Sequence, residues 1–363
     1  MSKYKPFTNL GPGDTIREEL EHYGWEQKDL AEIMGRTEKN ISQLVTNKAP
    51  ITYETALLLS KTFKQSTEFW LNLDARYRER LQESAKVKET EAKALIYRYM
   101  PVRAMRNSGI LPKGAKQLKE SVLRFWDIEE LEFDFLEERA VACFRKSAAF
   151  KNSFNPYYAL TWLRHVRNLA GQMRISGKYN EEGLRELGDR LPSYTIAETG
   201  IPDFIRNLGK VGVLFVQADH FPQTYTDGAS LLLDKRPVIA YTARHDRTDN
   251  FWFTMAHEIG HVLKHLHAAG DAFVDSLDHL DQEDTREREA DEFAETVLRC
   301  KAILKAFHDR QRPSSAKIHS VAEDLGVHPA IVCGCLQHHG KASYKSKSFH
   351  ALKEPVSHLI TQS

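Results

Sequence analysis

The five residues His257-Glu258-Ile259-Gly260-His261 constrain this 363-residue chain more than any other feature. They stand in an apolar stretch whose hydrophobic positions, 253, 256, 259, 260, 262 and 263, keep the spacing of a buried helix. Side chains four residues apart lie on one face of a helix, roughly 6 Å apart at Cβ. His257 and His261 could therefore hold one zinc ion, and Glu258 could take a proton from water at that ion.

A zinc site needs a third protein ligand, and two arrangements compete. In one known pattern the third ligand is a His six residues after the second, here His267, but that pattern needs Gly where this chain has Lys264. If the helix continues, His267 lies roughly 240° around from His261 and cannot reach the same ion. The other arrangement takes a carboxylate from a later helix.

Residues 285–298 predict such a helix. Glu289 shares a helical stripe with Phe293 and Val297, so we expect it to point inward and to be the third ligand, with Glu287 as the fallback. Two further side chains are expected near the ion without binding it. Asp291 would orient a ligand histidine, and His265 would orient one or pack beside it.

Residues from about 195 to 340 resemble the ImmA/IrrE family of metallopeptidases. The matching stretches are residues 227–229, 236–239, 249–254, 257–261 and 289–294, and the family often has Asn where this chain has Asp291. The resemblance implies a compact α+β zinc-peptidase domain. It also implies regulated cleavage of a DNA-bound repressor or partner rather than general digestion.

With that resemblance, His257, His261 and Glu289 would hold Zn²⁺ and leave one position open for water. Glu258 would act as general base and then pass the proton to the leaving amine. Mn²⁺ is an alternative, because a site of two histidines and a carboxylate accepts either ion. Tyr241 is a candidate donor to the oxyanion.

Residues 11–80 read as a run of short helices. A first helix over 27–34, a turn at Gly35 and a second helix over 38–45, capped by Thr37, form a helix-turn-helix unit. The second helix of such a unit enters the major groove of DNA. Its outward side would present Lys39, Asn40 and Gln43 to the bases. Gln27, at the start of the first helix, would contact the DNA backbone.

This amino-terminal part resembles Cro/repressor-type helix-turn-helix domains and, more narrowly, HigA-type antitoxins. The stretches that carry the resemblance are residues 11–14, 17–21, 51–56 and 68–73. Residues 1–80 hold 12 Lys and Arg against 12 Asp and Glu, so their net charge is zero. Because non-specific DNA affinity grows with the number of phosphates neutralised, we expect a homodimer or a precise operator to be needed.

The remaining segments predict an α+β, mostly helical protein of several domains. We divide it into a helix-turn-helix domain (1–80), a helical connector or sensor (81–195), a peptidase domain (196–340) and a loosely ordered tail (341–363). A buried strand over 211–216 and a hairpin of 229–233 with 237–241 form a small sheet beside the site helix. Residues 318–336 read as helix, Gly turn and helix, with an apolar second half that favours packing over DNA reading.

From the composition we expect a cytoplasmic protein. There is no run of 18 apolar residues and no apolar leader, and four Cys fit a reducing compartment. Cys333 and Cys335, with His338 and His339 nearby, suggest a second metal site. Two Cys two positions apart on a helix point about 200° apart, however, so we interpret them as buried thiols.

Three hypotheses follow. The first, which we prefer, is a DNA-binding regulator with a zinc endopeptidase domain that cleaves a repressor, a partner or itself, in stress response, mobile-element control or a toxin–antitoxin-like system. The second is an antitoxin and autorepressor that binds a small toxin, with the peptidase domain as a binding platform. The third is a peptidase whose helix-turn-helix only docks a protein substrate.

Overall fold

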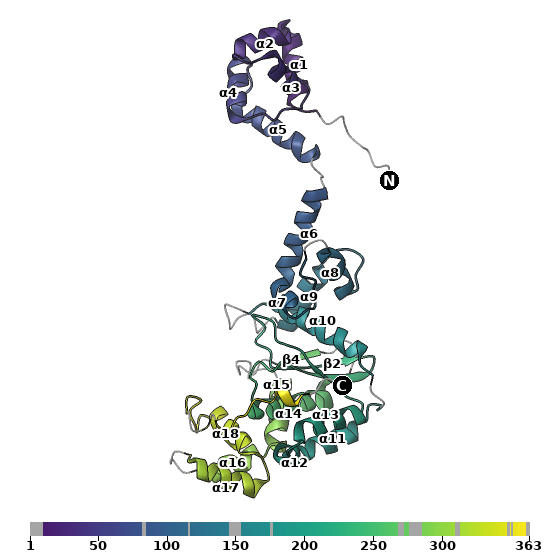
Figure 1. Cartoon of the computed structure of the whole chain (residues 1–363), viewed down its shortest axis with the longest axis vertical. Helices are drawn as coiled ribbons and strands as arrows, with labels where there is room; N and C mark the ends of the chain where they lie inside the picture. Colours follow the sequence, from purple (N-terminus) through teal and green to yellow (C-terminus); the bar gives the residue numbers. More distant parts are fainter. Residues whose placement is uncertain are drawn as a thin grey trace. The chain divides into compact units, whose positions relative to one another are not determined.

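The computed structural model describes residues 10–81, 85–114, 117–144, 154–174, 177–267, 272–275, 285–308, 313–346, 349 and 351–360. It divides into two compact units, Met1–Ala94 and Leu95–Ser363, and the division falls within helix α6 (Ala85–Tyr99). Helices predominate in both units, and the second also holds a small sheet (Figure 1), so the expected mostly helical α+β class is confirmed. No helix among these residues is long and apolar enough to cross a membrane.

The first unit contains the predicted helix-turn-helix. Its helices are α1 (Pro12–Tyr23), α2 (Gln27–Met34), α3 (Glu38–Val45), α4 (Tyr53–Thr62) and α5 (Thr67–Leu81). Gly35 ends α2 with a left-handed φ of 60°, a conformation that favours glycine. Thr37 then caps α3, its Oγ1 accepting a hydrogen bond from the Asn40 amide at 3.3 Å. The helices close over a core of fully buried side chains that includes Ile16, Leu30, Ile41, Leu59 and Trp70.

The second unit is built around four strands in the order β1-β3-β2-β4. They are β1 (Leu214–Gln217), β2 (Gly228–Leu233), β3 (Arg236–Tyr241) and β4 (Ala272–Asp275). β1 runs parallel to β3, while β2 is antiparallel to both β3 and β4. The predicted hairpin is present: Asp234 and Lys235, with φ of 48° and 65°, turn the chain between β2 and β3. Strand β4 is an addition to the predicted sheet.

The sheet is covered on both faces because its buried strands alternate their side chains between two cores. Leu214 and Val238 belong to one core, whereas their neighbours Phe215 and Ile239 belong to the other. Figure 1 shows α10 and α14 on opposite sides of the sheet. The expected connector thus packs on the sheet, since α6 to α10 supply most of one core.

The helices on the α10 face are α7 (Val102–Asn107), α8 (Leu118–Trp126), α9 (Asp134–Phe144) and α10 (Pro156–Gln172). Those of the other core are α11 (Glu181–Asp189), α12 (Leu191–Ile196), α13 (Gly200–Lys210), α14 (Thr248–His265), α15 (Thr285–Val297), α16 (Cys300–Ala306), α17 (Ser315–Leu325) and α18 (Pro329–His338). Helices α17 and α18, joined at Gly326 with φ of 61°, form the predicted helix, turn and helix. Their apolar side chains lie in the core, as the sequence favoured.

The expectation of a loosely ordered tail is wrong for residues 351–360, which pack on the amino-terminal end of α14. Asp246 accepts hydrogen bonds from the amides of Val356 (2.7 Å) and Ser357 (2.8 Å). The buried Lys353 ammonium pairs with Asp249 and donates to the Gln337 side-chain oxygen at 2.5 Å. These contacts, and the buried Val356 side chain, tie the segment into the core around α14.

Candidate metal centre

The centre is built on α14, which is buried along most of its length. His257, Glu258 and His261 are at most 1% exposed, and apolar side chains of α14 such as Trp252, Met255 and Ile259 fill the core around them. A polar triad costs free energy in such surroundings unless its members are satisfied. The position of these residues therefore indicates a site, as the sequence predicted.

Two stripes of side chains face each other across α14 and α15. On α14 they are the residues 253, 257, 261 and 265, and on α15 they are Glu287, Asp291 and Glu295, each four positions after the last. The pairing of His257 with Asp291 and of His261 with Glu287 shows that the two helices run antiparallel. Gly260 lets them approach closely, since a Cβ there would lie 3.1 Å from Ala290 Cα.

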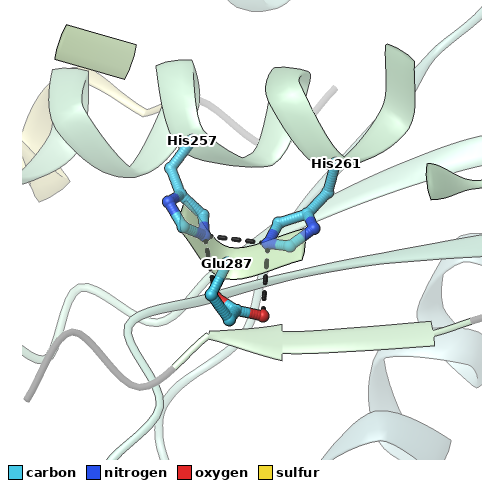
Figure 2. A group of neighbouring side chains, drawn as sticks. All are labelled: His257, His261 and Glu287. Carbon is cyan, nitrogen blue, oxygen red and sulfur yellow. Dashed lines mark hydrogen bonds and ion pairs between the residues drawn. The ribbon is translucent and has the colours of Figure 1, made fainter. Parts of the chain in front are cut away.

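Three side chains converge between the helices (Figure 2). The Nε2 atoms of His257 and His261 are 2.9 Å apart. Glu287 places one carboxylate oxygen 3.3 Å from His257 Nε2 and the other 3.5 Å from His261 Nε2. These residues form one of two groups within the described part of the chain that could hold a metal ion.

The expected third ligand, Glu289, does not face the two histidines. Its carboxylate meets His265 Nε2 at 2.9 Å and its side chain is 46% exposed, whereas Glu287, the fallback, faces them. The physical reason is the face on which α15 packs. Its buried stripe runs through Ala290, Ala294 and Val297, not through Phe293, which is only partly buried.

Hydrogen bonds hold both imidazoles with Nε2 towards Glu287. Asp291 Oδ1 lies 2.9 Å from His257 Nδ1, so that nitrogen donates. His261 Nδ1 lies 3.0 Å from His265 Nδ1. If His261 Nδ1 donates, His265 Nδ1 accepts and His265 Nε2 donates to Glu289. Each nitrogen in this series of hydrogen bonds then has a defined role as donor or acceptor. Asp291 and His265 thus lie where an orienting role requires them.

The donor set fits a metal ion of the zinc type. Two nitrogens bound to one tetrahedral zinc at about 2.0–2.1 Å lie roughly 3.3 Å apart. The separations of 2.9, 3.3 and 3.5 Å among the three side chains match that spacing. Burial lowers the pKa of His261, which favours the neutral imidazole that binds metals. Burial opposes ionisation of Glu287, but His257 and His261 outweigh it when their Nε2 atoms carry protons, and hold the pKa of Glu287 well below its usual range.

The Glu258 carboxylate lies beside the start of β2. It is fully buried, and a Cβ on Gly228 would lie 2.7 Å from Glu258 Oε1 and 2.5 Å from Thr254 Cγ2. The absence of a side chain at Gly228 therefore makes room for the carboxylate. Sequence reasoning noted Gly228 only within a matching stretch and did not see this contact.

Two other candidates lie elsewhere. Tyr241 is buried against Phe251 in the core, and its hydroxyl donates to the His245 carbonyl at 3.4 Å. Burial raises the pKa of Tyr241. His267 follows the end of α14, and its Nε2 donates to the Lys264 carbonyl at 2.7 Å.

The four residues expected at DNA are all exposed. Lys39, Asn40 and Gln43 lie on α3, and Gln27 is the first residue of α2. They share the surface with two ion pairs, Arg36 with Glu54 at 2.7 Å and Lys28 with Glu26 at 2.8 Å. The helix-turn-helix geometry thus leaves the predicted reading side chains open to solvent.

Comparison with known proteins finds two matching segments. Residues 208–336 match the family model of the IrrE N-terminal-like domain, a peptidase family. Residues 16–70 match the helix-turn-helix family model. The peptidase-family segment contains α14 and α15, and therefore every residue of the centre described above.

The curated relatives match only a short stretch. A protein of Haemophilus influenzae, an "Uncharacterized HTH-type transcriptional regulator", is 40% identical over 65 residues, or 18% of this chain and 61% of that protein. The regulators YbaQ and YddM of Escherichia coli K12 are 38% identical over 72 residues (20% of this chain, 61% of YbaQ) and 37% over 62 (17% and 66% of YddM). The chain thus spans about three fifths of the length of the first of these relatives.

Proposed function

We propose that this protein is a DNA-binding regulator whose second unit is a metal-dependent endopeptidase. The observation that carries the proposal is the convergence of His257, His261 and Glu287, with Glu258 buried beside them on the same helix. Its peptide substrate would be a DNA-bound repressor, a partner protein or the chain itself.

His257, His261 and Glu287 would hold the ion, which is Zn²⁺ or, depending on supply, Mn²⁺. When bound, the ion supplies a Lewis acid that activates water and polarises the scissile carbonyl. Asp291 fixes the ring of His257, and the chain through His265 to Glu289 fixes that of His261. Glu289 thus serves as a positioning residue in this proposal, not as a ligand.

Glu258 would move the proton. Its carboxylate accepts a proton from the attacking water and delivers it to the nitrogen of the leaving amine. The buried surroundings of Glu258, against β2 and Thr254, keep the carboxylate in one position and limit competing water.

The first unit would bring the peptidase to its target. Lys39, Asn40 and Gln43 are placed for base and phosphate contacts on an exposed helix face. Joining a DNA-binding unit to a peptidase raises the local concentration of DNA-bound substrates, without any need for a strong protein–protein contact.

A set of isosteric variants tests the peptidase. We expect Glu258→Gln to keep its zinc, measured by mass spectrometry of the metal, and to lose cleavage. Glu287→Gln should lose the zinc ion of this centre as well as cleavage, while Glu289→Gln should retain most of it. Pull-downs from native cells with intact masses would then reveal a protein held whole by Glu258→Gln and truncated by the wild type.

Two outcomes would overturn this assignment. Cleavage at the wild-type rate by Glu258→Gln would show that Glu258 is not the general base. The full zinc content of the wild type in Glu287→Gln, together with one ion fewer in Glu289→Gln, would return the ligand role to Glu289. A small protein held intact by both the wild type and Glu258→Gln would instead support an antitoxin.

DNA binding is tested separately, by gel shift with the chain's own promoter at several salt concentrations. Replacing Lys39 by Ala should weaken binding to all sequences and reduce the salt slope by about one, since one phosphate contact is lost. Replacing Gln43 by Ala should instead relax sequence preference. A wild type that shifts no DNA at any salt concentration would contradict the proposal.

A further inference from the structure

We propose that Glu295, His338 and His339 form a second divalent-cation site, one that does not depend on the peptidase proposal. These three residues are the other group among the described side chains whose donor atoms could share an ion. All their donor atoms lie within 4.8 Å of one another, and Glu295 Oε1 is 3.0 Å from His339 Nε2.

The site is held by two helices that are both fixed in the core. Glu295 lies near the end of α15, next to Ala294, which is fully buried. His338, two positions after the buried Leu336, is the last residue of α18, and His339 caps that helix. The backbone positions of all three donors are therefore set by packing, and only their side chains need to adjust to an ion.

The side chains are oriented before any ion arrives. The imidazoles of His338 and His339 stand almost perpendicular, at 86°, with centroids 4.9 Å apart. Phe253 of α14 stacks on His338 at 6.0 Å. The carboxylate of Glu295 and the ring of His339 are 22% and 30% exposed, so an ion can reach them from solvent.

A cavity of about 250 Å³ lies beside the three donors, which contribute to its lining together with Asn250 and Tyr344. A carboxylate and two imidazoles suit zinc and similar transition-metal ions rather than magnesium or calcium, which prefer oxygen ligands. The cavity leaves room for water to complete the coordination of such an ion.

The second site shares a helix with the first. Glu295 lies four residues after Asp291 and eight after Glu287, on the same stripe of α15. The ring of Phe253 stands between the sites, since it also lies 6.4 Å from the ring of His257. An ion that tied Glu295 to α18 would restrain α15, and with it the carboxylates that face His257 and His261.

Metal stoichiometry tests the proposal on the full chain. The protein is stripped with a chelator, dialysed against buffered zinc and analysed by mass spectrometry of the metal. We expect two zinc ions per chain for the wild type and one for Glu295→Gln. Glu287→Gln should also retain one, held at the second site, and the Glu287→Gln, Glu295→Gln double variant should retain none.

Matched variants separate this site from surface histidines and from misfolding. His319, exposed on α17, provides the control, and His319→Gln should still bind two ions. If Glu295→Gln fails to fold by circular dichroism, His339→Gln replaces it. If Glu295→Gln and His339→Gln both keep the zinc content of the wild type, whether that is one ion or two, Glu295 and His339 form an ion pair only and the proposal is overturned. A single zinc in the wild type that both variants lose would support this site and count against the first.

Discussion

Replacing Gly228 by Ala tests whether the space around Glu258 is essential to the centre. The added methyl would lie 2.5 Å from Thr254 Cγ2 and 2.7 Å from Glu258 Oε1. Non-bonded carbon atoms prefer a separation of about 3.5–4.0 Å, so one side must retreat by roughly 1 Å. Neither neighbour can do so freely, because Thr254 and Glu258 are both fully buried on α14.

The cost follows from that displacement. Overpacking a filled interior costs about 1–3 kcal/mol, which lowers the melting temperature of a unit of this size by roughly 2–10 °C. A catalytic group moved by about 1 Å loses on the order of 10²-fold in rate. A Cβ on Gly228 would meet Thr254, Glu258 and Ala240 and neither histidine, so zinc content should change much less than cleavage.

The assay compares thermal unfolding, zinc content and cleavage of the trapped target for Gly228→Ala and Gly171→Ala. Gly171 lies on α10 with nothing within 4 Å of an added Cβ, so the same substitution should leave stability unchanged or raise it by about 0.5–1 kcal/mol. If Gly228→Ala melts and cleaves like the wild type, Glu258 is not confined as described and our reasoning about its position fails.

Three further substitutions have definite expected outcomes. Asp291→Ala should weaken zinc binding by about 10- to 100-fold, measured by chelator competition, because His257 loses the carboxylate 2.9 Å from its Nδ1. Thr37→Ala should destabilise the first unit by about 1 kcal/mol in thermal unfolding, because α3 loses its cap. Lys353→Met should cost about 3 kcal/mol in denaturant unfolding, because Asp249 is left buried without its lysine.

Controls for these predictions come from neighbouring exposed positions. Glu292→Ala, on the same helix as Asp291, should leave zinc affinity unchanged, and Lys345→Met should leave stability unchanged. In Lys353→Met, Asp249 still pairs with Arg247, 3.1 Å away. We therefore expect the loss of unfolding free energy to lie at the lower end of the range for breaking a buried ion pair. Equal losses in a variant and its control would refute the corresponding contact.

The face of α14 was predictable because its pattern is long and unambiguous. Apolar residues recur from 251 to 263 with the polar triad at fixed offsets among them, and the helix spans Thr248–His265. The hairpin of β2 and β3 was equally clear, since each strand is apolar and a short polar link joins them. Strand β4 is only four residues long, too short for an alternation to be recognised.

The choice between Glu287 and Glu289 could not be settled from the same kind of pattern. In α15 the side chains nearest α14 are alanines, because the helices approach closely at Gly260. The one large apolar residue used as a marker, Phe293, lies at the edge of that contact. A stripe drawn through Ala290 and Ala294 would have indicated Glu287, but small residues carry a weak hydrophobic signal.

The packing of residues 351–360 also lay beyond sequence reasoning. The segment is short, and its attachment depends on single partners far away in the chain. Buried Lys353 is an example, since lysine in isolation predicts exposure. Lys353 is buried because its partner Asp249 is itself held in the interior at the start of α14.

That attachment sets an order of events during synthesis. Lys353 follows its partner Asp249 by 104 residues, which a ribosome adds in roughly 5–20 s. Throughout this interval the start of α14 lacks the segment that closes it, whereas the helix-turn-helix unit has long left the ribosome. A nascent chain could therefore engage DNA before its metal centre is complete, and the two units would become functional in sequence rather than together.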